Sequence, residues 1–183
     1  MITERVPLGQ AQVIAWRIEA ELRPICKRIA IAGSIRRRKE SVKDVEILCV
    51  PEAGPTNLFG DPMEDAITLH LRNECGKGRW AMRVNAKNAT TFGPLNKLML
   101  YDGFPVDIFT ATLENWGRDL MIRTGSADWN KRIMQRFIDL KRHGHAYGPH
   151  AMTFGNGMTA DAPDEETMFR LLGWEYQPPE ART

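Results

Sequence analysis

Two apolar segments carry acidic residues at positions that strongly constrain the fold. Asp44 and Glu46 flank Val45 at the start of one segment, and Asp107 lies between a valine and an isoleucine in the other. Because side chains alternate along a strand, each segment places its carboxylates on one face and its apolar residues on the other. If the two strands are neighbours, one face of the sheet is buried and three carboxylates share a patch on the opposite face.

Such a patch has a definite chemistry. Three carboxylates that approach one another repel, and the cluster persists mainly when divalent cations neutralise it. Hard oxygen ligands suit Mg²⁺, and two such ions about 4 Å apart can hold both the attacking and the leaving oxygen of a phosphoryl transfer. The alternative interpretation of Asp44 and Glu46 alone is an acidic pair on an exposed edge strand.

A second polar segment precedes the acidic strand. Gly33 and Ser34 follow a strand predicted over residues 28–32, and a basic run, Arg36 to Lys39, comes directly after them. A Gly-Ser turn offers backbone N–H groups and a hydroxyl to a phosphate, and arginine forks match phosphate oxygens. The spacing therefore predicts a triphosphate site beside the metal site.

The hydrophobic periodicity predicts an α+β fold with a change of character near residue 112. The first part alternates helices and strands that share one mixed sheet, and the second part is mainly helical. Strands are expected over 28–32, 44–50, 80–84, 97–101 and 104–109, and helices from Pro7 to Leu22, from Asp61-Pro62 to Gly76, and over 115–123, 127–142 and 164–172, with a Gly-rich hairpin at 155–157. Domains are predicted at 1–111 and 112–183.

Composition excludes several classes of protein. Lys plus Arg exceed Asp plus Glu by 25 to 23, so the net charge of +2 is too small for binding to nucleic acid by bulk charge alone. The three cysteines are an odd number without a C-x-x-C spacing, which argues against a disulfide scaffold or zinc ribbon. No apolar stretch is long enough to predict a membrane span or a secretion signal, so a cytoplasmic protein is expected.

Five motifs occur in order along the chain. They are RVP at 5–7, GSIRR at 33–37 with DVE at 44–46, VDI at 106–108, TGSADWN at 124–130, and the tail EETMFRLLGWEYQPP at 165–179. Together they resemble the motifs of the family X DNA polymerases, the group typified by DNA polymerase beta. The resemblance covers nearly the whole chain and is loosest over residues 52–96.

The resemblance implies a nucleotidyltransferase architecture. Residues 1–111 would form the palm, a mixed sheet flanked by helices, and residues 112–183 a small helical and hairpin subdomain of the thumb type that binds the nucleotide. Because the chain starts where the palm of the family starts, the resemblance implies a compact form without the lyase and fingers domains. A monomeric enzyme of bacterial or viral origin is expected.

The resemblance further implies a DNA polymerase that adds dNMP from dNTP to the primer 3′-hydroxyl of gapped or primed duplex DNA, in short-gap filling during repair. Two Mg²⁺ ions would serve as cofactors, with Mn²⁺ as a possible substitute. Asp44 and Glu46 would hold both ions. Asp107 would hold the catalytic ion beside the primer hydroxyl and assist its deprotonation.

The triphosphate contacts are implied in the same way. Ser34 and Arg37 would grip the β and γ phosphates, and Gly33 would let the backbone approach closely. Two departures from the family pattern affect this end of the site. Glu46 stands where aspartate is usual, which leaves the preference between Mg²⁺ and Mn²⁺ open. Lys43 replaces a small residue and can reach a phosphate.

The nucleoside contacts fall in the second subdomain. Gly125 and Ser126 would form the turn over the sugar, Trp129 would pack against the base, and Asn130 would hydrogen-bond to its minor-groove edge. An isoleucine and an arginine at 122–123 replace the aromatic pair that usually screens the sugar. An untemplated or ribonucleotide-using transferase is therefore the alternative function. A non-catalytic nucleic-acid-binding module is a third interpretation, disfavoured because all three acidic positions are filled.

Other polar and aromatic clusters have simpler interpretations. The histidines are predicted to lie in a solvated loop at a helix end rather than to bind zinc, and three tryptophans are predicted to be core residues. Two basic clusters are either solvated faces or contacts to DNA phosphates. The residues are His143, His145 and His150; Trp80, Trp116 and Trp174; Arg132, Arg136, Lys141 and Arg142 in one basic cluster; and Lys77, Arg79, Arg83 and Lys87 in the other.

Overall fold

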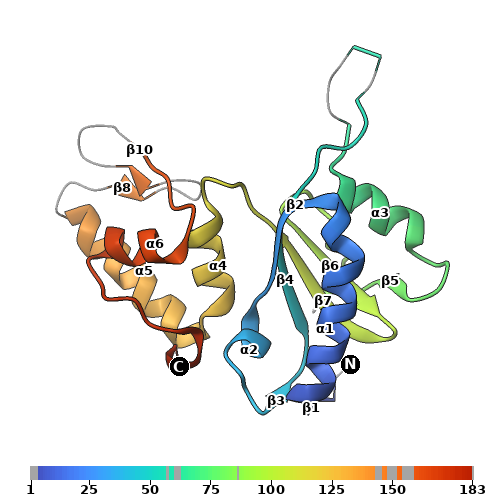
Figure 1. The fold of residues 1–183 in the computed structure, drawn as a ribbon, viewed down its shortest axis with the longest axis horizontal. Helices are drawn as coiled ribbons and strands as arrows, with labels where there is room; N and C mark the ends of the chain where they lie inside the picture. The colour runs from blue at the N-terminus through green and yellow to red at the C-terminus, as the bar shows by residue number, and fades with distance from the viewer. Residues whose placement is uncertain are drawn as a thin grey trace. The chain divides into compact units, whose positions relative to one another are not determined.

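The chain forms two compact units, Met1–Ala111 and Thr112–Thr183. The structure is a computed structural model that describes residues 4–56, 58–59, 63–85, 87–142, 146–147, 152–153 and 159–182. The first unit contains a mixed sheet flanked by helices, and the second is mainly helical (Figure 1). The predicted α+β fold is confirmed.

The first unit is built on a five-stranded sheet. In spatial order the strands are β2 (Cys26–Ile31), β4 (Val45–Pro51), β7 (Phe104–Thr110), β6 (Asn96–Tyr101) and β5 (Trp80–Met82). The β4–β7 pair is parallel and every other pair is antiparallel. A separate two-stranded ribbon joins β1 (Val6–Pro7) to β3 (Ser41–Val42). The parallel pair is central, and it carries the acidic motifs.

Two helices bury one face of this sheet. Helix α1 (Leu8–Leu22) and helix α3 (Ala66–Glu74) pack on the apolar side of β4, β6 and β7, and Figure 1 shows α1 lying along the strands. Helix α1 ends where predicted because Pro24 cannot continue the hydrogen-bond ladder; a short 3-10 helix, η1 (Arg23–Ile25), follows it. The core includes Ala11, Ala15, Ile18, Val45, Ile47, Ile67, Leu71, Val106 and Ile108.

Helix α3 begins later than the sequence predicts. Its N-cap is Asp65, whose Oδ1 accepts a hydrogen bond of 2.8 Å from the Thr68 N–H, and this satisfies a donor that the first turn would leave free. Met63 is exposed and precedes the helix. The predicted start at Asp61 and Pro62 lies outside the described residues.

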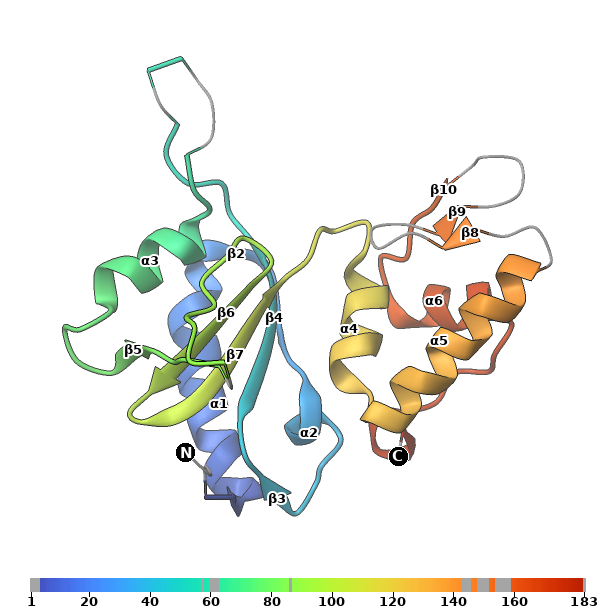
Figure 2. The same ribbon diagram turned by 180° about the vertical axis from the view of Figure 1, so that it is seen from behind.

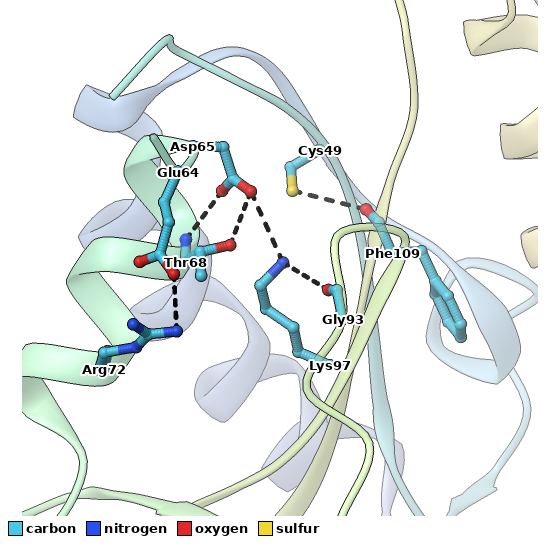
Figure 3. A network of polar contacts seen from close by, with 8 residues as sticks. All are labelled: Cys49, Glu64, Asp65, Thr68, Arg72, Gly93, Lys97 and Phe109. Atoms are coloured by element: carbon cyan, nitrogen blue, oxygen red, sulfur yellow. Dashed lines mark hydrogen bonds and ion pairs between the residues drawn. The ribbon is translucent and has the colours of Figure 1, made fainter. Parts of the chain in front are cut away.

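A buried lysine ties α3 to the sheet. None of the Lys97 side chain is exposed; its Nζ donates to the Gly93 carbonyl at 3.1 Å and lies 3.9 Å from Asp65 Oδ2 (Figure 3). Burial lowers the pKa of Lys97, and the Asp65 carboxylate opposes this shift. Nearby, the Cys49 thiol donates to the Phe109 carbonyl at 3.5 Å. Its hydrogen bond to Cys26, together with burial, raises its pKa, so Cys49 is an unreactive core thiol.

The second unit packs three helices around an aromatic core. Helices α4 (Trp116–Thr124), α5 (Ala127–Arg142) and α6 (Glu165–Leu172) are accompanied by three short strands, β8 (Ala146–Tyr147), β9 (Met152–Thr153) and β10 (Thr159–Ala160), in the order β10-β9-β8. Trp129, Ile133, Phe137, Met168, Phe169 and Leu172 form the core. The predicted Gly-rich turn at 155–157 and the three loop histidines lie outside the described residues.

A buried ion pair anchors the C-terminal segment. Arg182 is fully buried, and its guanidinium donates to both carboxylate oxygens of Glu165, at 2.5 and 3.2 Å. Arg182 also donates to the Gln177 carbonyl, and its Cζ lies 5.1 Å from the centre of the Phe169 ring. The segment after α6, which includes the 3-10 helix η2 (Pro179–Ala181), is thus held against the core of this unit.

Tryptophans predicted to be core residues lie in both units. Trp80 and Trp116 are buried, as expected of core residues, and Trp174 is half-buried with its ring 5.6 Å from that of Trp129. The three cysteines are free thiols. Among the described residues, no helix is long and apolar enough to cross a bilayer.

Candidate active site

Glu46 and Asp107 are direct neighbours on the two central strands. They are register partners in the parallel β4–β7 pair, and both point away from the face covered by α1, whereas Val45 and Val106 point into the core. Figure 2 shows β4 beside β7 from the opposite side. The alternation read from the sequence therefore brings two of the three predicted carboxylates side by side.

Asp44 lies immediately before β4. Its carboxylate is half-buried and is 3.5 Å from Lys43 Nζ, which is itself largely exposed. Asp44 and Glu46 are two residues apart at the start of one strand, so both belong to the same end of the sheet. Lys43 supplies positive charge beside this carboxylate.

Gly33 lies against the Glu46 carboxylate. It starts α2 (Gly33–Arg36), has φ of +63°, and is so close to Glu46 that a Cβ atom would overlap the Glu46 carboxylate. Burial lowers the pKa of the Arg37 guanidinium, and the nearby negative charge of Glu46 opposes this shift. The glycine thus makes room for Glu46, and Arg37 supplies a positive charge near it.

We expect Gly33→Ala to damage both the fold and the site. The left-handed backbone costs an L-residue about 1–2 kcal/mol, and the new methyl group would displace the Glu46 carboxylate. Chemical denaturation should show a loss of this size in the free energy of unfolding. Gly9→Ala is the control because nothing lies within 4 Å of Gly9 in α1; it should hold stability or raise it by about 0.5–1 kcal/mol. Equal stability of both variants would contradict the strain argument.

Ser34 is the second residue of α2. Its Oγ is buried and has no hydrogen-bond partner among the described residues. The backbone around it is closed into a tight loop, in which Lys39 N–H donates to the Ser34 carbonyl at 3.0 Å and Arg38 has φ of 56°. A buried, unsatisfied hydroxyl costs free energy, which a ligand oxygen at this position would recover.

Arg83 is the functional candidate that the sequence did not single out. Its Nη2 forms an ion pair with Asp107 Oδ1, and the side chains are only 27% and 19% exposed. The sequence placed Arg83 in a basic cluster, and two further members of that cluster are also paired with acidic residues: Lys77 with Glu74 and Arg79 with Asp102. Only the order of the strands could have revealed the Arg83 pair.

The carboxylates provide the right donor atoms for a hard cation, but they are not gathered around one point. Among the described residues, no group of three or more His, Cys, Asp or Glu side chains is arranged to hold a metal ion. Asp107 is paired with Arg83, and the Glu46 carboxylate lies against Gly33. Three carboxylates and a hydroxyl are oxygen donors of the type that Mg²⁺ prefers.

The predicted nucleoside residues surround the start of α5. Gly125 is packed so tightly against Trp129 and Asn130 that a Cβ atom would overlap the Trp129 ring. Ser126 Oγ accepts a hydrogen bond of 3.0 Å from the Trp129 N–H, and Asn130 Nδ2 donates to the Ile122 carbonyl at 2.9 Å. None of the Trp129 side chain is exposed, so it supports this turn from within the core. Asn130 Oδ1 is buried without a hydrogen-bond partner among the described residues.

The predicted basic face of α5 is used partly for packing. The Arg132 guanidinium lies over the Trp129 ring, 5.0 Å from its centre, and Arg136 Nε donates to the Leu172 carbonyl at 2.7 Å. The side chains of Lys141 and Arg142 lie outside the described residues. Arg136 therefore links α5 to the end of α6, while Arg132 packs on a ring of its own helix, so this face is more than a solvated surface.

A cavity of about 540 Å³ opens at the other end of β4, away from the carboxylates. Its lining mixes both signs of charge with apolar groups and includes Lys27, Glu52, Arg72 and Phe92. Its lining also includes the Glu64–Arg72 ion pair of 2.7 Å, which is drawn in Figure 3. None of the predicted site residues lines this cavity.

Comparisons with known proteins support the fold. No family model matches the sequence, and no curated protein matches it. Among solved structures, the chain is similar to polymerase beta of Leishmania infantum, crystallised as a ternary primer/template complex, with a TM-score of 0.67 and 18% sequence identity. The match covers 100% of this chain and 78% of that chain. The chain therefore has a fold similar to that of polymerase beta.

Proposed function

We propose that this protein is a nucleotidyltransferase of the DNA polymerase type, which adds dNMP from dNTP to the primer 3′-hydroxyl of gapped or primed duplex DNA. The observation that carries the proposal is the register of Glu46 and Asp107 on adjacent parallel strands, with Asp44 beside them and Gly33 against Glu46. The similarity of the fold to a primer/template-bound polymerase beta supports it. We further propose short-gap repair synthesis as the role of this activity.

The acidic residues would carry the chemistry. Asp44, Glu46 and Asp107 would hold two Mg²⁺ ions, or Mn²⁺ in their place, which when bound supply the positive charge that activates the hydroxyl and stabilises the leaving diphosphate. Asp107 accepts a hydrogen bond from the primer 3′-hydroxyl and favours its deprotonation. Glu46 is longer than an aspartate, and Gly33 leaves the space that its carboxylate occupies.

The loop after β2 would bind the triphosphate. The unsatisfied Ser34 hydroxyl donates to a phosphate oxygen, and Arg37 and Lys43, which lie next to the carboxylates, supply compensating positive charge.

The second unit would bind the nucleoside. We assign the sugar to the turn of Gly125 and Ser126, and the minor-groove edge of the base to Asn130, whose Nδ2 has a second N–H beside the one that donates to Ile122 and would donate it to an acceptor of that edge. Trp129 acts by packing beneath this turn, because its ring is buried. The position of Asn130 is fixed by its hydrogen bond to the Ile122 carbonyl.

Primer extension on a gapped duplex tests this function. With one dNTP at a time and Mg²⁺ or Mn²⁺, we expect incorporation opposite the complementary template base only. Asp44→Asn serves as the inactive control, because it removes one carboxylate at nearly constant volume. Incorporation that ignores the template base, or that persists in Asp44→Asn, would contradict the proposal.

A ribonucleotide-using or untemplated transferase is the second candidate. The observation that favours it is the pair Ile122 and Arg123, which precedes the turn of Gly125. Neither residue has an aromatic ring that could screen the sugar, although both are at least partly accessible. Comparing dNTP with rNTP on templated and single-stranded primer ends separates the two functions. Equal use of rNTP, or extension of single strands, would favour this second candidate.

A further inference from the structure

The acidic face of the sheet carries a row of residues that runs across β4, β7 and β6 to Arg83, the residue after β5. Glu46 pairs with Asp107, Asp107 pairs with Leu98 on β6, and the Arg83 N–H donates to the Leu98 carbonyl at 3.0 Å. Residues directly opposite each other on neighbouring strands present their side chains on the same face. Arg83, at the end of β5, is therefore aligned with the two carboxylates.

This alignment explains why Arg83 selects Asp107. Strands are about 4.8 Å apart, so Asp107 lies two strands from Arg83 and Glu46 lies three. The arginine reaches across Leu98 to contact Asp107 Oδ1. It comes from the opposite edge of the sheet to the loop that carries Gly33 and Arg37, so it is independent of the predicted phosphate-binding segment.

Each of the three carboxylates has a basic residue of its own. Asp44 has Lys43 at 3.5 Å, Glu46 interacts electrostatically with Arg37, and Asp107 is paired with Arg83. Three carboxylates near one another need compensating positive charge. Lys43 and Arg37 adjoin the predicted phosphate loop, whereas Arg83 holds a carboxylate oxygen that a metal ion would need.

The hydrogen-bond donors of the Arg83 guanidinium are only partly satisfied. Its Nη2 pairs with Asp107, but its Nε is buried without a hydrogen-bond partner among the described residues. An unsatisfied donor next to a charged contact raises the free energy of this arrangement. The ion pair is therefore suited to exchange, because an Arg83 side chain that leaves Asp107 can donate its Nε hydrogen bond to water.

We propose that Arg83 is a cationic placeholder at Asp107, which occupies the carboxylate in the metal-free protein and must be displaced before a divalent ion can bind there. The proposal rests on the proposed function for the identity of the metal site. It makes Arg83 a positioning residue with two effects. Arg83 keeps the acidic patch stable without metal, and it weakens the binding of the first ion.

The test is a titration with Mn²⁺ alone, in the absence of nucleotide and DNA, with free Mn²⁺ followed by electron paramagnetic resonance. We expect Arg83→Gln to bind Mn²⁺ about tenfold more tightly than the unsubstituted protein, because a positive charge in contact with the ligand carboxylate is removed. Arg83→Lys keeps the charge and should remain near the affinity of the unsubstituted protein. Thermal unfolding of both variants shows whether they are folded.

Arg79→Gln is the matched control. Arg79 immediately precedes β5, and it pairs with the exposed Asp102 at 3.8 Å. The substitution removes the same charge from the same edge of the sheet, so it should leave the Mn²⁺ affinity unchanged. A tighter affinity in Arg79→Gln as well would show a general effect of net charge and would overturn the placeholder role.

Asp107→Asn separates this inference from the proposed function. If the protein binds Mn²⁺ with an affinity that falls in Asp107→Asn but does not change in Arg83→Gln, the placeholder role is wrong and the metal site stands. If Arg83→Gln tightens binding only when Asp107 is present, the inference is supported. If no variant binds Mn²⁺ at a saturable site, both the inference and the proposed function are overturned.

Discussion

Asp107→Asn is expected to lower the rate of nucleotide incorporation by at least about 10³-fold. The substitution keeps the size of the side chain and removes the charge that would hold the catalytic ion beside the primer hydroxyl. Stabilisation by a bound metal is worth several kcal/mol, and about 4 kcal/mol corresponds to 10³-fold in rate. Single-turnover primer extension with saturating dNTP measures this effect directly.

Asp102→Asn is the control for that experiment. Asp102 is in the turn of the same β6–β7 hairpin, it is exposed, and its φ of 49° suits asparagine equally well. It should retain the activity of the unsubstituted protein. If Asp107→Asn kept more than about a tenth of the activity, Asp107 would have no place in the reaction and the proposed site would be wrong.

Arg182→Met is expected to destabilise the second unit by about 3–5 kcal/mol. The substitution leaves the Glu165 carboxylate, which is only 4% exposed, without the guanidinium that neutralises it. Chemical denaturation followed by tryptophan fluorescence is the measurement, because the Trp129 ring lies 6.0 Å from the Arg182 guanidinium carbon. The double variant Glu165→Leu with Arg182→Met should recover much of the loss, since it removes both buried charges.

An exposed ion pair on α5 gives the comparison. Lys131 and Asp128 are 2.7 Å apart and their side chains are 77% and 76% exposed. Lys131→Gln should therefore change the free energy of unfolding by less than about 0.5 kcal/mol. A loss in Arg182→Met no larger than that in Lys131→Gln would mean that the buried pair does not anchor the C-terminal segment.

The faces of the strands could be predicted because alternation is a local property. Val45 and Glu46 point to opposite sides for the same reason that any two successive strand residues do, so Glu46 was placed correctly before any pairing was known. Helix α1 was bounded by Pro7 and Pro24, which act on the backbone alone. Asp102 and Gly103 form the turn between β6 and β7, and both have the positive φ that an Asp-Gly hairpin turn requires.

The Arg83–Asp107 pair could not be predicted because it depends on register across three strands. Its partners are 24 residues apart, and they meet only because β6 lies between β5 and β7 with Leu98 opposite Asp107. The burial of Lys97 is similar, since a lysine in a strand is expected at the surface until the Asp65 cap and the Gly93 carbonyl are known to face it. Such pairs follow from tertiary structure and leave no periodic signal.

The start of α3 shows a different limit. Asp61 and Pro62 carry the usual residues of a helix start, yet Asp65 caps the helix. Two capping aspartates in one segment compete, and tertiary contacts select between them: Lys97 lies beside Asp65 and Thr68 donates to it. Trp129 lies in a stretch that resembles a nucleotide-binding motif in sequence, while its ring is buried in the core of the second unit.

A crystal of the protein soaked with dNTP and Mn²⁺ tests the central claim most directly, because the anomalous signal of manganese locates each ion. We predict ions bound by the carboxylate oxygens of Asp44, Glu46 and Asp107, with Arg83 released from Asp107 and the triphosphate against Gly33 and Ser34. Manganese and triphosphate bound elsewhere, with Arg83 still on Asp107, would contradict it.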